Sequence, residues 1–183
     1  MKKTVNILYK IDLLLVVLIF PIALPIMMLA GIFLIVFNGR ALFRQERIGF
    51  EGKKFTIYKF QTLLEGAQEQ LSHNIDENMY VFGGRFLRSS KIDELPQLVN
   101  VLKGDMSLVG PRPGLLSDTS LIEIRARYGC FSVRPGVSGL AQILKISMNN
   151  KRRLARVDQV FVKNRSVRLY FYILFRTGFI WSR

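Results

Sequence analysis

The sequence predicts a mostly helical α+β fold with one helix inserted in a membrane. Three observations lead to this prediction: an uncharged apolar run at residues 13–37, strand-like alternation at residues 54–60, and basic residues interleaved with large aromatics at residues 151–175. Half of the 183 residues are hydrophobic and the mean hydropathy is +0.24, which suits one modest globular domain plus an apolar segment. We therefore expect a membrane-inserted re-entrant helix at residues 1–39 and a globular domain at residues 40–183.

The charge balance predicts a polyanionic partner. The chain has 27 Lys and Arg against 13 Asp and Glu, a formal net charge of +14, which suits nucleic acid, anionic lipid or phosphorylated substrates. Cys130 is the only cysteine, so no intrachain disulfide can form. Because His73 is the only histidine, the metal we expect is a hard cation held by carboxylates and phosphates, such as Mg²⁺.

The N-terminal apolar run is long enough to cross a membrane, but it contains Pro21 and Pro25. At about 1.5 Å per residue it could cover the roughly 30 Å hydrocarbon core, yet each proline removes a helical hydrogen bond near the middle. Basic residues such as Lys10 and Arg40 lie on both flanks, so both flanks carry the cytoplasmic signal. We favour a helix-break-helix that dips into the membrane and returns; a kinked single span and a cleaved signal peptide are the alternatives.

Shorter elements are expected after residue 40. Residues 42–44 and 54–60 should pair as a β-hairpin across the Gly49–Gly52 turn. Polar residues 65–78 suggest a helix with a loop, and the stretches 104–114 and 134–140, rich in Gly and Pro, indicate shaped loops. The C-terminal part has the composition of amphipathic interfacial helices on anionic lipid, with an ordinary basic surface and a core helix as the alternative.

A helix at residues 90–103 is predicted by its end signals. Ser90 and Asp93 have the spacing of a capping box, and Gly104 is a natural stop. Pro96 is tolerated only near a helix start, which places Asp93 and Glu94 in or just before the first turn. There the helix dipole favours an ionised carboxylate. The pair is either a charged nucleophile or metal ligand, or merely a cap of the helix.

Several cations lie near this acidic pair in the sequence. The chain lacks a Walker A sequence, a G-x-G-x-x-G and a D-x-D pair, which disfavours kinase, dehydrogenase and ordinary metal-dependent glycosyltransferase functions. An arginine fork binds phosphate oxygens in bidentate fashion, and flanking prolines would fix its backbone. The phosphate-complementary cations are Lys59, Arg85, Arg88, Lys91 and Arg112.

Several motifs, in this order, closely resemble the bacterial sugar transferase family, the monotopic phosphoglycosyl transferases. The resemblance covers nearly the whole chain, and the length is similar to the minimal single-domain form. It rests on Tyr58-Lys59-Phe60, Leu87-Arg88, Asp93-Glu94-Leu95-Pro96-Gln97-Leu98, residues 100–107, Val109-Gly110-Pro111-Arg112-Pro113 and residues 134–142.

The resemblance implies transfer of a phosphosugar from a UDP-sugar to a polyprenyl phosphate, with release of UMP, as the first membrane step of glycan assembly. It implies that Asp93 is the nucleophile that becomes a phosphosugar ester, and that Glu94 assists through Mg²⁺ or proton handling. Both carboxylates are candidate Mg²⁺ ligands. The implied location is the bacterial inner membrane, with the catalytic domain on its cytoplasmic face.

The same resemblance implies phosphate or nucleotide contacts for Arg88 and Arg112, and then for Lys59. For Arg85 and Arg134 a structural role is the alternative. Pro25 matches the helix-breaking proline of the family, although Leu24 stands before it where a serine is common.

Three further departures from the family pattern are visible. Gln61 stands where a basic residue is usual, and Ile143–Ser147 replaces a Gly-Arg-Asn-like stretch, so both are candidates for sugar selection. Asp158 matches a family aspartate, but Phe161 stands where tyrosine is frequent.

Two other functions are weighed against this one. A non-catalytic basic scaffold on the membrane surface would bind anionic lipid or nucleic acid, and such binding would survive Asp93→Asn. No nucleic-acid motif is present, so we expect no nucleic-acid partner. A direct displacement with Glu94 as general base would use the same substrates without ping-pong kinetics.

Overall fold

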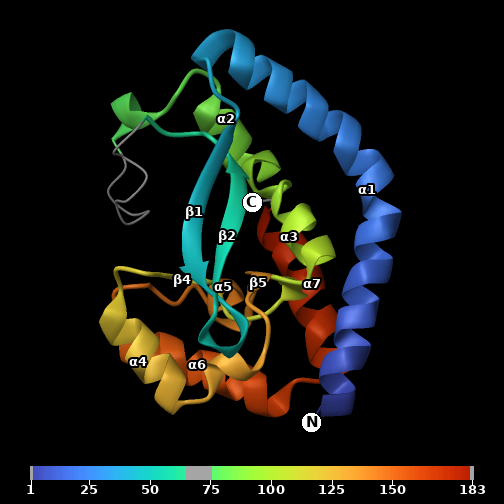
Figure 1. The fold of residues 1–183 in the computed structure, drawn as a ribbon, viewed down its shortest axis with the longest axis vertical. Coiled ribbons are helices and arrows are strands. Elements are labelled where there is room, and N and C mark those ends of the chain that lie inside the picture. Colours follow the sequence, from blue (N-terminus) through green and yellow to red (C-terminus); the bar gives the residue numbers. More distant parts are fainter. Residues whose placement is uncertain (1, 65–75, 182–183) are drawn as a thin grey trace.

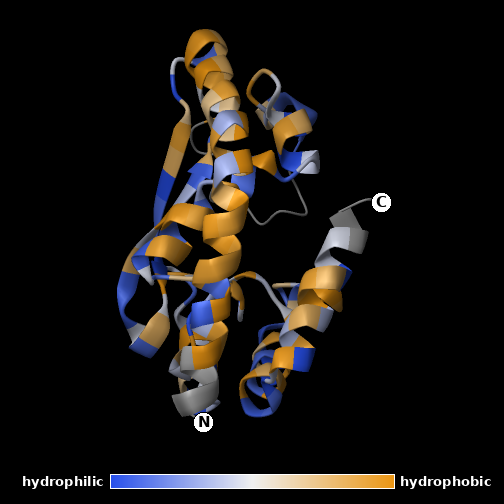
Figure 2. Ribbon diagram, turned by 90° about the vertical axis from the view of Figure 1, so that its right-hand side faces the viewer, coloured by the Kyte–Doolittle hydropathy of each residue, from blue (hydrophilic) through white to orange (hydrophobic). Residues whose placement is uncertain are grey.

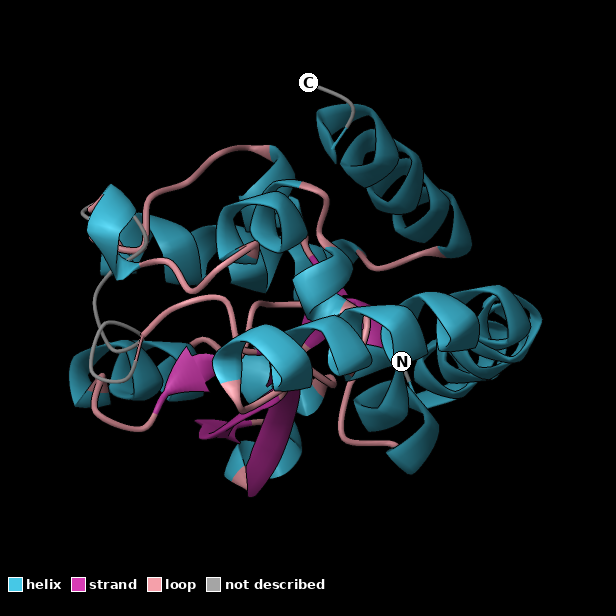
Figure 3. Cartoon of the chain, turned by 90° about the horizontal axis from the view of Figure 1, so that it is seen from above, coloured by secondary structure: helices cyan, strands magenta, loops and turns pink. Residues whose placement is uncertain are grey.

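The fold is mostly helical with two small sheets, as the sequence predicts. The computed structural model describes residues 2–64 and 76–181. Figure 1 shows one long helix along the side of the molecule and a hairpin in the middle, and from above the short strands form a small part among the helices (Figure 3). The helices are α1 (Lys2–Asn38), α2 (Gly84–Ser89), α3 (Gln97–Lys103), α4 (Thr119–Arg127), α5 (Leu140–Ile143), α6 (Lys151–Asn164) and α7 (Val167–Trp181).

Helix α1 is continuous through both Pro21 and Pro25, so the chain does not break into two helices there. It follows one side of the molecule and then bends over the top (Figure 1), and prolines are a common cause of such bends. Most of the helix is apolar, and hydrophilic residues lie toward its N-terminal end (Figure 2); by length and composition Ile7–Asn38 could cross a membrane. The re-entrant path and the division into parts at residues 1–39 and 40–183 stay predictions.

Both ends of α1 are tied to the rest of the chain. The carboxylate of Asp12, 1% exposed, accepts hydrogen bonds from Ser107 Oγ at 2.6 Å, from Leu108 N at 3.0 Å and from the Tyr170 hydroxyl at 2.5 Å. At the other end, the Asn38 side-chain amide donates to Phe82 O at 3.2 Å and accepts from Phe82 N at 3.1 Å. These two contacts hold α1 against the globular part near both of its ends.

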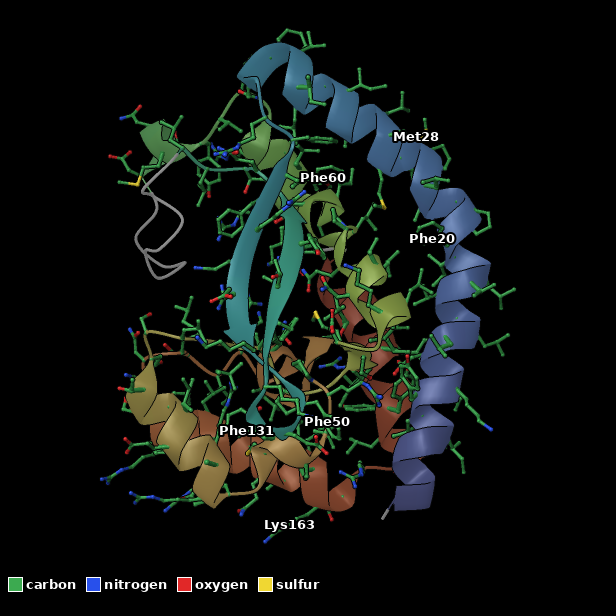
Figure 4. The ribbon with its side chains drawn as sticks, in the orientation of Figure 1. Phe20, Met28, Phe50, Phe60, Phe131 and Lys163 are labelled. Atoms are coloured by element: carbon green, nitrogen blue, oxygen red, sulfur yellow. The ribbon has the colours of Figure 1, made fainter. Side chains whose placement is uncertain are left out.

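The predicted β-hairpin is confirmed and is longer than expected. Strand β1 (Leu42–Ile48) pairs antiparallel with β2 (Lys54–Phe60), in a register that sets Phe43 opposite Lys59. A short strand β4 (Gly114–Leu115) adds to the free edge of β1. Phe60 lies at the upper end of the hairpin, and Phe50 lies beside Phe131 at its turn (Figure 4). The buried Asn100 side chain fixes β2 on α3, since it accepts from Tyr58 N and donates to Thr56 O.

The capping-box prediction for a helix at 90–103 is wrong. Ser90 ends α2, because its hydroxyl donates to Phe86 O and Leu87 O. Lys91 then takes a left-handed conformation with φ 61°, which stops α2 and starts a separate 3-10 turn at Ile92–Glu94. Helix α3 begins only after Pro96 and ends at Gly104, which is left-handed as predicted. Asp93 and Glu94 therefore lie just before α3.

The two stretches predicted as loops contain a pair of parallel strands. Strand β3 (Ser107–Val109) pairs with β5 (Gly136–Ser138). The two backbones approach so closely that a Cβ on Gly136 would lie 2.0 Å from Gly110 N, a distance that only glycine permits. Of the helix predicted at 65–78, residues 65–75 lie outside the described residues; Glu77–Met79 forms a 3-10 turn.

Helices α6 and α7 complete the fold at the C-terminal end. Helix α7 packs against α1 in the main core, where Tyr170 and Ile173 join Leu8 and Val16. Outward-facing side chains of α7 include Tyr172 and Phe175, which are 52% and 70% exposed. That these helices lie on a lipid surface stays a prediction.

Candidate active site

A pocket of about 600 Å³ lies beside the hairpin and collects most of the predicted site residues. Such a volume suits a ligand larger than a simple phosphate. Strand β2 contributes Lys59, and α2 contributes Arg88. The 3-10 turn contributes Asp93 and Glu94, and the loop before β4 contributes Arg112.

Asp93 is buried, and one of its oxygens is without a partner. The residue is 6% exposed, and Oδ1 has no hydrogen bond in the described part of the chain. The left-handed Lys91 determines this placement, because it ends α2 and turns the following residues back toward the pocket. Backbone conformations of this kind are costly for residues other than glycine, and they are frequent at functional sites.

The two carboxyl groups are held in different ionisation ranges. Burial and the neighbouring Glu94 raise the pKa of Asp93 to about 6, although Lys59, Lys91 and Arg88 act in the opposite direction. Burial would also raise the pKa of Glu94, but Lys59 and Arg112 outweigh it and lower that pKa to about 2. Near neutral pH, Glu94 is therefore fully ionised, whereas Asp93 has a pKa only about one unit below neutral pH.

Glu94 is engaged in an ion pair. Its Oε1 lies 2.8 Å from Lys59 Nζ, and the two side chains are 11% and 19% exposed. Burial lowers the pKa of Lys59, and Glu94 counteracts this shift. Since Glu94 already has a cation as partner, the partnerless oxygen of Asp93 is the more available acceptor or nucleophile.

Arg112 stands on a loop whose backbone is fixed at three successive carbonyls. Gly136 N donates to Pro111 O at 2.9 Å, Arg125 Nη1 donates to Arg112 O at 2.8 Å, and Arg47 Nη1 donates to Pro113 O at 3.4 Å. Prolines on both sides restrict the backbone further. The Arg112 guanidinium is thus presented to the pocket from a rigid support.

The arginine that holds this loop is itself held by Asp158. Arg125 donates from Nε and Nη2 to Asp158 Oδ2 at 2.9 and 2.6 Å, and the side chains are 3% and 2% exposed. The sequence indicated Asp158 by its family match but gave no signal for Arg125. A contact between α4 and α6 therefore reaches Arg112 through one buried side chain.

Arg85 and Arg134 lie elsewhere. Arg85 forms an exposed ion pair with Glu77. Arg134 stacks 4.0 Å above the ring of Tyr9 and donates to Gly104 O at 2.7 Å. Neither lines the pocket, and the contacts of Arg134 are those of a structural residue.

Other pocket residues were not singled out as site residues by sequence reasoning. Lys91 was noted as a nearby cation, Gln142 only as part of the motif at residues 134–142, and Lys145 only within Ile143–Ser147; Arg47 had no signal of a site residue. Lys145 shares with Lys91 a left-handed backbone, at φ 52°. Of the departures from the family pattern, Lys145, Ile146 and Ser147 line the pocket. Gln61 does not; its amide donates to Leu63 O.

The acidic pair can be tested as a Mg²⁺ site from its own chemistry. No group of three or more His, Cys, Asp or Glu side chains is placed to hold a metal among residues 2–64 and 76–181. Mg²⁺ is usually bound through one or two carboxylates together with substrate phosphates. Two adjacent carboxyl groups with one oxygen free fit that pattern.

The model of the bacterial sugar transferase family matches residues 3–183. The chain belongs to the bacterial sugar transferase family. The matched residues include the acidic pair at Asp93 and Glu94.

Curated relatives in the family include enzymes with named substrates. The chain is 33% identical over 174 residues to a UDP-N-acetylgalactosamine-undecaprenyl-phosphate N-acetylgalactosaminephosphotransferase of Aeromonas hydrophila, covering 91% of this chain and 41% of the relative. It is 41% identical over 127 residues to a UDP-glucose:undecaprenyl-phosphate glucose-1-phosphate transferase of Caulobacter vibrioides, covering 65% and 46%.

An uncharacterized sugar transferase of Bacillus subtilis is 46% identical over 101 residues, covering 55% of this chain and 50% of the relative. The chain therefore spans half or less of the length of these relatives.

Proposed function

We propose that the protein is a phosphoglycosyl transferase that moves a phosphosugar from a UDP-sugar to a polyprenyl phosphate. The observation that carries the proposal is the buried carboxyl group of Asp93, with a partnerless oxygen in a pocket lined by Lys59, Arg88, Lys91 and Arg112. Relatives in the family act on UDP-sugars and undecaprenyl phosphate.

The reaction has two steps on one nucleophile. In the first, an Asp93 oxygen attacks the sugar-bearing phosphorus, the bond from that phosphorus to the bridging oxygen breaks, and UMP leaves with the bond's electrons. In the second, a phosphate oxygen of the polyprenyl phosphate attacks the same phosphorus. The bond to Asp93 breaks, which restores the carboxylate and yields polyprenyl diphosphosugar.

The surrounding residues have separate tasks in these steps. The guanidinium groups of Arg112 and Arg88 and the ammonium group of Lys91 neutralise charge on the transferring and leaving phosphates. Glu94 holds Lys59 in the pocket and raises the pKa of Asp93. Asp93 and Glu94 would hold Mg²⁺, which when bound supplies further charge neutralisation on the phosphates.

We place the enzyme at the bacterial inner membrane, with the catalytic domain on the cytoplasmic face. The contacts of Asp12 and Asn38 hold both ends of α1 against the same globular part, which favours a helix that enters and leaves on one side. Basic residues near both ends, such as Lys10 and Arg40, favour the cytoplasmic side and a surface of anionic lipid.

Sugar selection belongs to the part of the pocket made by Lys145, Ile146 and Ser147. Exchanging Ile143–Ser147 for the corresponding segment of a relative with a known donor should change donor preference. An unchanged preference would place the selection elsewhere.

The direct test is UMP release from a panel of UDP-sugars by detergent-solubilised protein with Mg²⁺ and undecaprenyl phosphate. Wild type should release UMP from one donor, and should gain the mass of a phosphosugar when the acceptor is omitted. Asp93→Asn should do neither. Glu123→Gln removes a carboxylate from an exposed site on α4 and should behave as wild type.

The outcomes separate three functions. UMP release without a covalent adduct would favour direct displacement, in which donor and acceptor are bound together. Salt-sensitive lipid binding that survives Asp93→Asn, without UMP release from any donor, would favour the basic scaffold. Removal of divalent cations with EDTA tests the Mg²⁺ requirement separately.

A further inference from the structure

A second, smaller cavity adjoins the large pocket at Glu94. It has a volume of about 60 Å³ and shares Lys91, Glu94, Arg112 and Gln142 with the large pocket. Its own lining comes from β5, α5 and α7, through Val137, Ser138, Ile143 and Thr177. One water needs roughly 10 to 15 Å³ by this measure, so the cavity can take the oxygens of one phosphate group.

Two hydroxyl groups form one wall of this cavity. Ser138 Oγ and Thr177 Oγ1 are hydrogen-bonded to each other, and Ser138 is 4% exposed. The Thr177 hydroxyl donates to Ile173 O at 2.8 Å, so the hydrogen between the two oxygens comes from Ser138. That hydrogen is the one that can turn toward a phosphate oxygen in the cavity.

Helix α7 connects this cavity to the apolar side of the molecule. Thr177 is close to the end of α7, whose buried face packs against α1 through Tyr170 and Ile173. On the same helix, Tyr172 and Phe175 are 52% and 70% exposed. The phosphate of a lipid can thus reach Lys91 and Arg112 in the small cavity, while the apolar tail of the lipid stays beside α7 and α1.

We propose that the small cavity is the subsite for the phosphate of the lipid-linked acceptor, with Ser138 and Thr177 as acceptor-side residues. This rests on the proposed function, and it assigns separate routes to the two substrates. The UDP-sugar enters and UMP leaves through the large pocket, and the polyprenyl phosphate enters along α7.

In-line displacement explains why the two cavities share Lys91 and Arg112. The acceptor oxygen must attack phosphorus from the side opposite the bond to Asp93, which is the side that the UMP oxygen has vacated. The same cations therefore meet the leaving phosphate first and the entering phosphate second. Only the remainders of the two molecules, the uridine and the lipid, need different space.

The test measures the two half-reactions separately in the variants Thr177→Val and Ser138→Ala. The first half-reaction is measured as the burst of UMP from enzyme and UDP-sugar alone. The second half-reaction is measured as transfer of the phosphosugar from the isolated adduct to undecaprenyl phosphate. We expect each substitution to slow the second half-reaction at least about tenfold more than the first half-reaction, and to raise the KM for undecaprenyl phosphate. Thr119→Val, an exposed hydroxyl on α4, is the matched control.

Equal losses in both half-reactions, or no loss in either, would overturn the subsite. Thermal unfolding of each variant identifies a loss of activity that is caused by misfolding. Ser138→Ala is the smaller change, so it provides an independent test of the subsite. If wild type shows no burst, the covalent route fails instead. The subsite is then judged by whether Thr177→Val raises the KM for undecaprenyl phosphate but not that for the UDP-sugar.

Discussion

Asp93 and Asp158 are both buried carboxyl groups, 6% and 2% exposed, in very different surroundings. Asp158 accepts two hydrogen bonds from Arg125 and does not line the large pocket. Asp93 has a partnerless oxygen, lies beside another carboxylate and borders a pocket of about 600 Å³. Burial is the largest cause of a raised pKa at both.

The difference lies in how each site deals with the cost of burial. At Asp158 one arginine supplies both charge and hydrogen bonds, so the pair is a structural element. At Asp93 the cations are spread around the pocket and Oδ1 accepts no hydrogen bond from the described residues, so the cost of burial is only partly offset. Arg125 links the two sites, because the same guanidinium also holds the backbone of Arg112.

Breaking the paired site should have the largest effect on stability. Arg125→Ala leaves Asp158 buried without a partner, and we expect the free energy of unfolding to fall by about 3 to 5 kcal/mol. Denaturant unfolding in detergent measures this change. Arg127→Ala, on the exposed side of the same helix, should cost far less; similar losses in both variants would contradict a structural role specific to Arg125.

The double variant Arg125→Met/Asp158→Leu separates the two roles of this pair. It removes both charges together, so it should recover most of the stability that Arg125→Ala loses. UMP release should stay below wild type, because Arg112 O still lacks its donor. Full recovery of both quantities would show that Arg125 does not position Arg112.

Asp93→Asn should make the protein more stable at high pH. The folded-state pKa of about 6 lies above the ordinary value of 3.8, so the protonated carboxyl group favours the folded state below about pH 4. This contribution is lost as the pH rises through about 6. At pH 8 the substitution should therefore raise the unfolding free energy, by up to about 3 kcal/mol, and near pH 4 it should change little. Thermal unfolding at both pH values tests the sign.

Arg112→Lys keeps the charge but loses the planar fork. We expect kcat/KM for UMP release to fall about 10- to 100-fold, with unfolding unchanged, because a lysine offers no bidentate contact to phosphate. Steady-state kinetics provide the measurement, with the exposed Arg127→Lys as control. A loss below twofold would mean that Arg112 acts only by its charge.

The pH dependence of the wild-type enzyme should give the smallest of these effects. If ionised Asp93 is the nucleophile, UMP release should rise about tenfold per pH unit below 6 and level off above it. The burst measured without acceptor isolates this step. A rising limb centred near pH 4 would indicate a nucleophile with an ordinary pKa.

The sequence predicted where the acidic pair lies in the fold better than it predicted the elements that support this pair. The hairpin and the position of Asp93 and Glu94 before α3 follow from local signals, namely alternation and the proline at position 96. The role of Ser90 could not be predicted from local signals, because a serine at this position can end one helix or cap the next. Which of the two it does depends on the left-handed conformation of Lys91.

Contacts between distant segments account for the other misses. Strands β3 and β5 pair Ser107 with Gly136, and each is too short to carry a strand pattern. Arg125 reaches Asp158 across 33 residues. Arg134 belongs to a motif that resembles the family, yet its side chain stacks on Tyr9, which is far from it in the sequence. No single-sequence pattern reports such pairings.

The two contacts that hold α1, at Asp12 and at Asn38, also give this helix a fixed rotational phase. One residue inserted between them would turn the far end by about 100° and shift it by roughly 1.5 Å, so the two contacts could not form together. An insertion of three or four residues would nearly restore the rotation, but it would shift the far end by about 4.5 to 6 Å and break one of the contacts as well. The two contacts therefore fix the length of the helix between Asp12 and Asn38 as well as its rotation.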